Sequence, residues 1–521
     1  MEHQVLAVRG VGGYRQYRIP AMAVTPSGRI ITIYDGRFDF DDLPGPVDLV
    51  IRTSDDNGTT WSPQSIFRKH EGIAGFGDAS IIIDPNVGNF GRIIVLYQST
   101  KIAGFFESKL GSDLDDPLVA HIGRSISDDD GISWRHEVIT EQLKDENTPG
   151  IFATSGMGAV IPDGEFAGRL LQTFVLRRDS QLLSAIGYSD DHGENWQLGA
   201  LIPGGNETAI AGFVDGSVLV NSRATPFRLA GKSIDGGKTL TWLEPDLGLP
   251  DPSDNGSIAT LKNGDVICTH NHDCDLRRNT VLKRSHDGGR TWITAISVEP
   301  GSSAYSTACE LTDGSIGVLY ERNAYQEIVF SKFQLAEFRP IDEVLSETKN
   351  VDDIEFTVIA RYIRPARDSK IEDVLKSAPL VPNVDMSVFQ SYERKEVGGI
   401  GGSTSGDSLF TSSELDQILG EISPGLHLND EIRFSVRITN ERDQEITNVR
   451  IMDRDDQIVF EGKSLASLEK ICLLDIRQLI QIEDLQARCA VFTFQLSAEF
   501  LDHMVGQVRA ISKVVKVELP T

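Results

Sequence analysis

Ten residues whose side chains bind anions, transfer protons or attack as nucleophiles are scattered between positions 18 and 321 of the chain. Guanidinium groups are planar and permanently charged, so they hold a carboxylate with two parallel hydrogen bonds. Carboxylates and phenols provide the groups that move protons. The ten residues are Arg18, Asp35, Arg37, Asp42, Asp78, Glu207, Arg223, Arg277, Tyr305 and Glu321. They can share one site only if the fold brings distant segments to a common point.

The overall charge of the chain limits what it can bind. The formal net charge is −27 over 521 residues, because 77 acidic residues outnumber 50 basic ones. The summed field repels nucleic-acid phosphates and anionic membrane surfaces, so we expect neither as a partner. An anionic ligand would therefore need a local cluster of arginines.

Five segments repeat one pattern of serine, aspartate, glycine and tryptophan, which we call Asp boxes. They are SDDNGTTW (54–61), SDDDGISW (127–134), SDDHGENW (189–196), SIDGGKTLTW (233–242) and SHDGGRTW (285–292), and they hold all five tryptophans. Aspartate and asparagine side chains bond to nearby backbone amides and glycine accepts a positive φ, so each box predicts a hairpin turn. The tryptophan would pack the turn onto its sheet.

A second series of turns alternates with the boxes. A glycine precedes a short apolar strand six times, at Gly28, Gly91, Gly168, Gly216, Gly264 and Gly314, with spacings of 63, 77, 48, 48 and 50 residues. This spacing suits one four-stranded antiparallel sheet per unit. We predict an all-β protein in which residues 1–338 form a six-bladed β-propeller. Strands of all blades converge at the end of its central channel, which explains why the candidate residues are scattered.

Residues 339–521 lack boxes and tryptophans. A Gly/Ser-rich segment at 395–408 predicts a flexible loop. Segments such as residues 429–453 alternate apolar and polar residues, which indicates strands with one buried face. We predict an immunoglobulin-like β-sandwich as the second domain, with a role in packing or attachment.

The cysteines and the N-terminal residues bear on the compartment. Five cysteines without short-spaced pairs argue against a disulfide framework. No apolar run is long enough for a membrane span, and MEHQVLAVRG lacks the basic and apolar regions of a signal peptide. The sequence as written predicts a cytoplasmic protein, or a secreted or cell-surface one if a signal peptide has been removed.

Several motifs in fixed order carry a family resemblance. YRIP (17–20), the Asp boxes, NET (206–208), NSR (221–223) and AYST (304–307) resemble the bacterial exo-α-sialidases, or neuraminidases, over roughly residues 8–335. The boxes alone occur in other propellers, so the ordered set carries the resemblance. It implies a glycoside hydrolase that releases terminal sialic acids from glycoproteins, glycolipids or oligosaccharides. We expect sialylated glycans as partners, no cofactor and a monomer.

The resemblance assigns the substrate carboxylate to three arginines. Motif positions match these to Arg18, Arg223 and Arg277, with Arg278 as an adjacent alternative to the last. Arg277 is preferred because it lies eight residues before Ser285 of the fifth box. Glu321 matches the glutamate that orients the first arginine.

The resemblance also assigns the catalytic groups. Tyr305 matches the nucleophile, Glu207 its general base, and Asp42 the acid/base that protonates the leaving oxygen and then activates water with net retention. The anomeric carbon of a sialic acid already carries a carboxylate, so an anionic nucleophile would be repelled. A neutral phenol can approach and lose its proton to a base.

Other positions leave alternatives open. Asp39 and Asp41 compete with Asp42, which is favoured because it directly precedes LPGP (43–46). Arg37 and Asp78 match residues that contact a ring hydroxyl of the sugar, and Asp35 is expected to shape its turn.

THNHDCD (269–275) suggests zinc, but its spacing fits no standard zinc pattern, so we predict no metal site there. Two further functions remain as alternatives: a non-catalytic sialic-acid-binding propeller, and a transglycosylating or anhydro-forming sialidase variant.

Overall fold

The protein is described by a computed structural model covering residues 3–38, 42–72, 74–179, 181–274, 277–323 and 325–346. Further on it describes residues 354–364, 431–440, 446–453, 458–465, 470–479, 489–502 and 505–518. The predicted Gly/Ser-rich loop at 395–408 lies outside these residues. The chain divides into two units, and the described part of the first ends at Val344.

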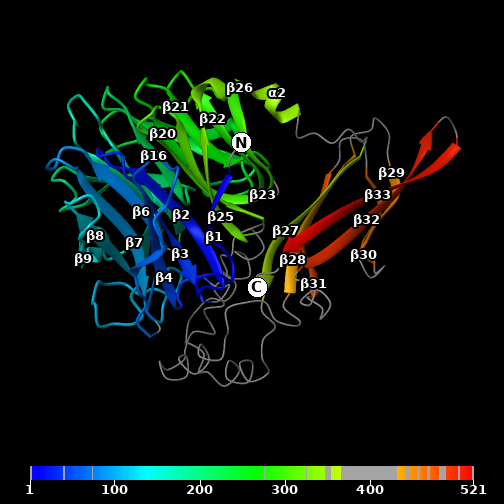
Figure 1. Cartoon of the computed structure of the whole chain (residues 1–521), viewed down its shortest axis with the longest axis horizontal. Coiled ribbons are helices and arrows are strands. Elements are labelled where there is room, and N and C mark those ends of the chain that lie inside the picture. The colour runs from blue at the N-terminus through cyan, green and yellow to red at the C-terminus, as the bar shows by residue number, and fades with distance from the viewer. Residues whose placement is uncertain are drawn as a thin grey trace. The chain divides into compact units, whose positions relative to one another are not determined.

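Four sheets of the first unit each contain a run of antiparallel strands in chain order (Figure 1). The first holds β2 (Gln16–Val24), β3 (Ile30–Arg37), β4 (Val47–Ser54) and β5 (Ser65–Arg68). The second holds β6 (Gly75–Asp84), β7 (Arg92–Thr100), β8 (His121–Ser127) and β9 (Arg135–Val138), with β11 (Gly156–Met157) parallel to β6. The third holds β10 (Gly150–Ala153), β13 (Leu170–Arg178), β14 (Gln181–Ser189) and β15 (Gln197–Pro203), with β12 (Ala159–Val160) on β13. The fourth holds β16 (Thr208–Gly212), β17 (Val218–Ser222), β18 (Phe227–Ser233) and β19 (Trp242–Pro250).

A fifth, eight-stranded sheet joins the two ends of the first unit. It contains β20 (Ser257–Thr260), β21 (Val266–Asn271), β22 (Arg278–Ser285), β23 (Thr294–Glu310), β24 (Ile316–Arg322), β25 (Glu327–Phe333), β26 (Arg339–Pro340) and β1 (His3–Val8). The 17-residue β23 pairs with β22 near its start and with β24 near its end. The N-terminal β1 pairs with β25, so a strand from the start of the chain closes the unit. The predicted all-β class is confirmed, and the arrangement is propeller-like.

Helices are few among the described residues: α1 (Thr140–Leu143), the 3-10 turn η1 (Leu335–Glu337) and α2 (Ile341–Ser346). None of the described helices has the length and apolar character needed to cross a membrane.

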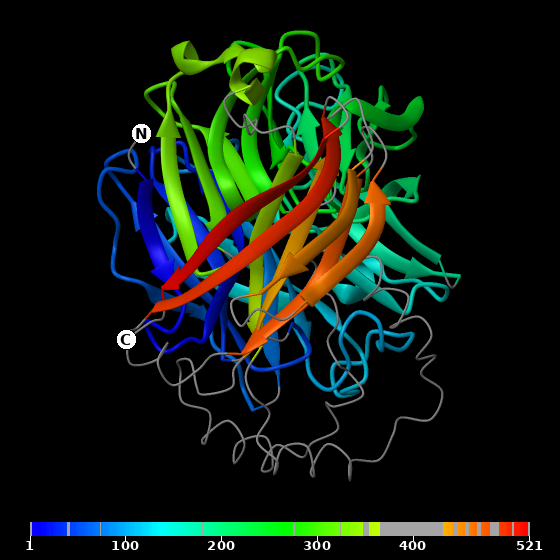
Figure 2. The same ribbon diagram turned by 90° about the vertical axis from the view of Figure 1, so that its right-hand side faces the viewer.

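The second unit contains two antiparallel sheets (Figure 2). One has the order β27 (Ile354–Arg364), β28 (Glu431–Asn440) and β31 (Lys470–Leu479). The other has the order β30 (Ile458–Leu465), β29 (Ile446–Met452), β32 (Cys489–Asp502) and β33 (Val505–Glu518).

The core of the first unit lies between neighbouring sheets. Strand β3 has no solvent-exposed residue along IITIYDGR, because sheets cover both of its faces. One apolar cluster joins Ile31 and Ile33 of β3 to Ile81 of β6 and Ile93 of β7. β-Branched residues suit such pleated surfaces packed on both sides. The inner strands are therefore held rigidly, which is what a site built from several sheets requires.

The Asp boxes form the predicted turns. In each box the first serine accepts a hydrogen bond from the amide of a glycine four residues on, at 2.9 Å in all five. Those glycines have φ between +81° and +91°. Thr60 donates to Asp56 through its hydroxyl and its amide, which lowers the pKa of Asp56 to about 2. Three of the tryptophans, Trp61, Trp134 and Trp196, pack against a phenylalanine, and the ring centroids of Trp61 and Phe330 are 5.0 Å apart.

An arginine links each of the first three boxes to the next one along the chain. Arg29, Arg92 and Arg169 directly follow a turn glycine, and each binds the box aspartate of its own unit through two nitrogens. The Nη1 atom of each donates to a backbone carbonyl of the following box, at Asp130, His192 and Gly236 respectively. At the fifth box the acidic and basic positions are exchanged. Asp265 follows the turn glycine, and His286 of the box lies 2.7 Å from its carboxylate. Adjacent units are thus tied by polar contacts outside the apolar core.

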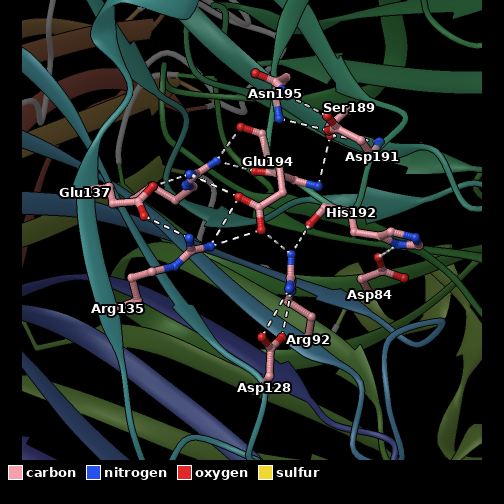
Figure 3. A network of polar contacts seen from close by, with 12 residues as sticks. Asp84, Arg92, Asp128, Arg135, Glu137, Ser189, Asp191, His192, Glu194 and Asn195 are labelled. Carbon is pink, nitrogen blue, oxygen red and sulfur yellow. Dashed lines mark hydrogen bonds and ion pairs between the residues drawn. The ribbon is translucent and has the colours of Figure 1, made fainter.

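The second and third boxes share a larger network, centred on Glu194 (Figure 3). The Glu194 carboxylate contacts Arg92 at 2.7 Å and Arg135 at 3.0 Å, and it lies 3.6 Å from Arg124. His192 of the same box lies 2.7 Å from Asp84 of the preceding sheet. Each contact is partly exposed and weak by itself, but together they fix the third box against its neighbour.

Arg169 is the most buried of the three linking arginines, which makes it the best test of this linkage. We expect Arg169→Ala to destabilise the first unit by about 2 kcal/mol, because the Gly236 carbonyl and Asp190 lose a charged donor. Urea unfolding followed by tryptophan fluorescence measures this unit alone, since every tryptophan lies in a box. Arg290→Ala is the control, because Arg290 is an exposed arginine of the fifth box. Equal stability of the two variants would contradict the linking role.

Candidate active site

Three inner strands of the first unit carry a β-bulge at a predicted site residue. The register shifts between Arg18 and Ala21 on β2, between Gly77 and Ser80 on β6, and between Ser303 and Ser306 on β23. The last two shifts flank Asp78 and Tyr305. A bulge re-aims side chains at the end of a strand, and Ile19 and Asp78 have the positive φ values of +57° and +56° that accompany it.

Tyr305 and Glu207 form the central contact of the site. The Tyr305 hydroxyl donates to Oε2 of Glu207 at 2.5 Å, and both residues are buried. Glu207 lies directly before β16. Nη1 of Arg223, just after β17, donates both to the Glu207 carboxylate and, at 2.8 Å, to the Tyr305 oxygen. The phenol therefore faces a base and a fixed positive charge at the same time.

Arg18 is held by Glu321 of β24. Oε1 of Glu321 accepts from Nε of Arg18 at 2.7 Å and from the Ile19 amide at 2.8 Å. Both charged side chains are almost completely buried, at 2% and 0% exposure. A buried charge is tolerated only when it is paired in this way.

All three predicted carboxylate-binding arginines surround the ring of Tyr305. The guanidinium carbons of Arg18, Arg277 and Arg223 lie 5.3, 5.3 and 6.0 Å from the ring centroid. Arg277 rather than its neighbour faces this group, because Arg278 pairs instead with Asp273 at 2.6 Å. The fold therefore brings three guanidinium groups to one phenol.

Burial raises the pKa of Tyr305 well above its ordinary value, and the negative charge of Glu207 adds to this effect. Arg223 and Arg277 act in the opposite direction by favouring the phenolate. Burial has the larger effect, so the phenol is neutral near pH 7. It needs a base to become a nucleophile, and Glu207 is in contact.

A second cluster contains the acidic candidates. Arg37 contacts Asp35 at 2.8 Å and Oδ1 of Asp42 at 2.9 Å, and it is fully buried. The Leu43 amide also donates to Oδ1 of Asp42, whose side chain remains 27% exposed. Arg37 and the Leu43 amide thus hold one oxygen of Asp42, while the side chain still reaches solvent.

The acidic cluster interacts electrostatically with Glu207. Burial, with Asp42, Asp35 and then Glu207 as further causes, raises the pKa of Asp78 well above its usual value. Burial likewise raises the pKa of Asp35 to about 6, although Arg37 opposes this. Ion pairs, hydrogen bonds and these interactions link all ten predicted residues.

The structure adds residues that the sequence did not indicate. Tyr325 contacts two arginines: its ring centroid is 4.3 Å from the guanidinium carbon of Arg18, and its hydroxyl accepts from Arg277 at 3.3 Å. Gln98 of β7 donates to Asp78 at 3.1 Å. Ser155 donates to Oε1 of Glu207 at 3.4 Å. None of them belongs to a motif, so only the three-dimensional contact identifies them.

Two expectations from the sequence can be placed only in part. Asp39 and Asp41, the rivals of Asp42, lie outside the described residues. His270 is completely buried on β21, and burial lowers its pKa well below the usual value. Within the described residues no three histidine, cysteine, aspartate or glutamate side chains form a group suited to a metal ion.

Comparisons with known proteins show which proteins the chain is similar to. The model of the BNR repeat-like domain matches residues 91–318. A sialidase of Micromonospora viridifaciens is 35% identical over 64% of this chain and 54% of its own length. An anhydrosialidase of Macrobdella decora is 30% identical over 39% of this chain and 29% of its own.

The solved structures of known proteins agree with these sequence matches. The structure named Hadza microbial sialidase Hz136 is 25% identical, with a TM-score of 0.56 over 62% of this chain and 66% of its own. The chain spans about half the length of the Micromonospora relative. In its repeats, its fold and its relatives, the chain is similar to sialidases that contain BNR, or Asp-box, repeats.

Proposed function

We propose that this protein is an exo-α-sialidase that hydrolyses terminal sialic acids from glycans with retention of configuration. The observation that carries the proposal is the hydrogen bond from Tyr305 to Glu207 amid three buried arginines. Few reactions need a neutral phenol, a base and three guanidinium groups at one point. A substrate with a carboxylate on its reacting carbon needs all of them.

Binding is the first requirement. The carboxylate of a sialic acid would lie against Arg18, Arg223 and Arg277, whose guanidinium groups provide charge-assisted hydrogen bonds. Arg37 and Asp78 would contact a ring hydroxyl of the sugar. The net charge of −27 makes this local positive charge necessary for binding an anion.

The chemical step would follow from the contacts of Tyr305. As the phenolic proton passes to Glu207, the Tyr305 oxygen forms a bond to the anomeric carbon. The bond to the glycosidic oxygen breaks, and Asp42 gives that oxygen a proton. Asp42 then takes a proton from water, whose oxygen attacks the same carbon. The bond to Tyr305 breaks and Glu207 returns its proton.

The domain organisation belongs to the same proposal. We divide the eight-stranded sheet at β23 into two blades, β20–β23 and β23–β25 with β1, which would give six blades in all. Residues 1–338 would be the catalytic propeller, and residues 339–521 a domain of immunoglobulin-like sandwich type that packs or attaches.

A related reaction is the specific alternative. One relative named an anhydrosialidase is 30% identical to part of this chain, which favours a transfer or anhydro-forming variant over a non-catalytic binding propeller. The choice between water and an internal hydroxyl as acceptor would leave the ten residues unchanged.

The role of the phenol is tested by Tyr305→Phe. We expect kcat for a fluorogenic α-sialoside to fall by at least about 10³-fold, because the nucleophile is lost while the arginines still bind the carboxylate. Tyr188→Phe is the matched control, since its partly exposed hydroxyl bonds to Gln197 away from the site. The assay is run with and without EDTA. Full activity of Tyr305→Phe would overturn the mechanism.

The third arginine is tested by comparing Arg277→Lys with Arg278→Lys. Lysine cannot grip a carboxylate with two parallel hydrogen bonds, so we expect a roughly tenfold to 100-fold rise in KM for Arg277→Lys. Arg278→Lys should change KM less than about twofold. Steady-state kinetics measures both, and the reverse order of effects would transfer the assignment to Arg278.

The acceptor is tested by following the products with proton NMR. We expect the α-anomer of free sialic acid to appear first and mutarotate to the β-anomer, because two displacements at one carbon restore its configuration. A β-anomer formed first would exclude the tyrosyl intermediate. An anhydro sugar as the main product would establish the alternative reaction.

A further inference from the structure

One short segment between β19 and β20 contacts groups on both sides of the phenol. Ser253 Oγ accepts from Nε of Arg223 at 3.1 Å, and the Ser253 carbonyl accepts from Nη2 of Arg277 at 2.9 Å. Asp254 forms an ion pair with Nε of Arg277 at 3.1 Å. Asn255 donates to Oγ of Ser155, which in turn donates to Glu207. We call Asp251–Asn255 the support segment.

The support segment is itself anchored by a buried ion pair. Nη1 of Arg228 on β18 donates to Asp251 at 2.6 Å and to the Asp254 carbonyl at 2.8 Å. The Asp254 amide donates to Asp251 at 2.7 Å. Ser253 has a φ of +64°, a strained value that persists only where the surroundings impose it. The segment is therefore a rigid part of the site.

Asp254 is an unusual counter-ion. Its side chain is 1% exposed, and neither carboxyl oxygen accepts a hydrogen bond from any described residue, although Nε of Arg277 is close. Glu321, by contrast, accepts two hydrogen bonds where it holds Arg18. The Asp254 carboxylate is poorly stabilised, so its protonated form is accessible.

The charges around Asp254 come from several strands. Arg277 and Arg223 favour the ionised form, whereas Asp251 and Glu321 oppose it. Burial is the largest effect and raises the pKa of Asp254 to about 7. The other groups of this environment are Arg228 on Asp251, Tyr305, whose own pKa Asp254 raises, and Tyr325, which accepts from Arg277.

We propose that Asp254 is a positioning residue whose charge sets how strongly Arg277 attracts the substrate carboxylate. The proposal rests on the proposed sialidase function. When Asp254 is ionised it neutralises part of the Arg277 charge and repels the incoming carboxylate. When it is protonated, Arg277 presents its full charge to the substrate.

The sign of the pH effect follows from linkage. An anionic substrate binds more tightly to the form with protonated Asp254, so binding takes up a proton near neutral pH. Affinity is therefore highest below the Asp254 pKa and falls as the pH rises through it. A residue that only maintained the fold would affect affinity equally on both sides of pH 7.

The test is Asp254→Asn, which keeps the shape and an acceptor oxygen but cannot ionise. At pH 6 wild-type Asp254 is mostly protonated, so we expect KM of the variant for a fluorogenic α-sialoside within about threefold of wild type. At pH 8 we expect KM of the variant to be about tenfold lower than that of wild type. Asp265→Asn is the control, because it alters a more exposed aspartate–arginine pair, with Arg284, outside the site, and it should follow the wild-type profile.

The outcomes separate the two proposals. Parallel KM profiles for wild type and Asp254→Asn, or an equal loss at both pH values, would overturn the role of Asp254 while leaving the sialidase function in place. A wild-type protein that neither hydrolyses the sialoside nor binds sialic acid would overturn both.

If Asp254→Asn does not fold, the wild-type protein still decides the matter. Calorimetric titration with sialic acid at pH 7, in two buffers of different ionisation enthalpy, should show net proton uptake. Binding without proton uptake would overturn the proposal.

Discussion

Three arginines buried around one phenol are the constraint to which the rest of the site responds. Each guanidinium must be paired to be buried at all, yet a fully neutralised arginine would no longer attract a carboxylate. The structure uses three different partners. Glu321 accepts from Arg18 and from the Ile19 amide, and Glu207 contacts Arg223 while also accepting from Tyr305. The Asp254 carboxylate stands beside Arg277 but accepts no hydrogen bond from any described residue. The positive charge is thus secured to different degrees at the three positions.

The same constraint explains why the site draws on so many strands. No single strand can present three arginines and their partners to one point, because alternate side chains point to opposite faces. Bulges at Arg18, Asp78 and Tyr305 turn the inner strands where the groups must converge. The box turns and linking arginines lie in other parts of these sheets and keep the units in register.

Sequence reasoning predicted the parts of this site that stand in motifs. The boxes and the all-β class could be predicted because turn chemistry and strand patterning are local properties. The ten candidate residues could be named because they lie in or beside motifs that resemble those of a known family. The support segment could not, since "DPSDN" resembles any polar loop until Arg223 and Arg277 are placed beside it. Tyr325 was not predicted either, because only its contacts with Arg18 and Arg277 in the folded chain distinguish it from other tyrosines. The linking arginines share a simple sequence pattern, since each directly follows a turn glycine. Their role could not be predicted because the carbonyls they bind lie up to about a hundred residues away. The length of β23 was not predicted either. The turn spacing indicates two separate sheets in this region, but the continuous 17 residues of β23 belong to one eight-stranded sheet.

The pairing of β1 with β25 has a consequence for how the chain is made. Strand β1 is synthesised before its partner, which follows more than three hundred residues later in the chain. Until then an unpaired strand edge with exposed Val5 and Val8 must persist, which is a hazard for association with other chains. Contacts of such long sequence separation form late and slowly. The shortness of β1 and its two polar residues, His3 and Gln4, limit this hazard. The first unit reaches its closed form only once β25 has been translated.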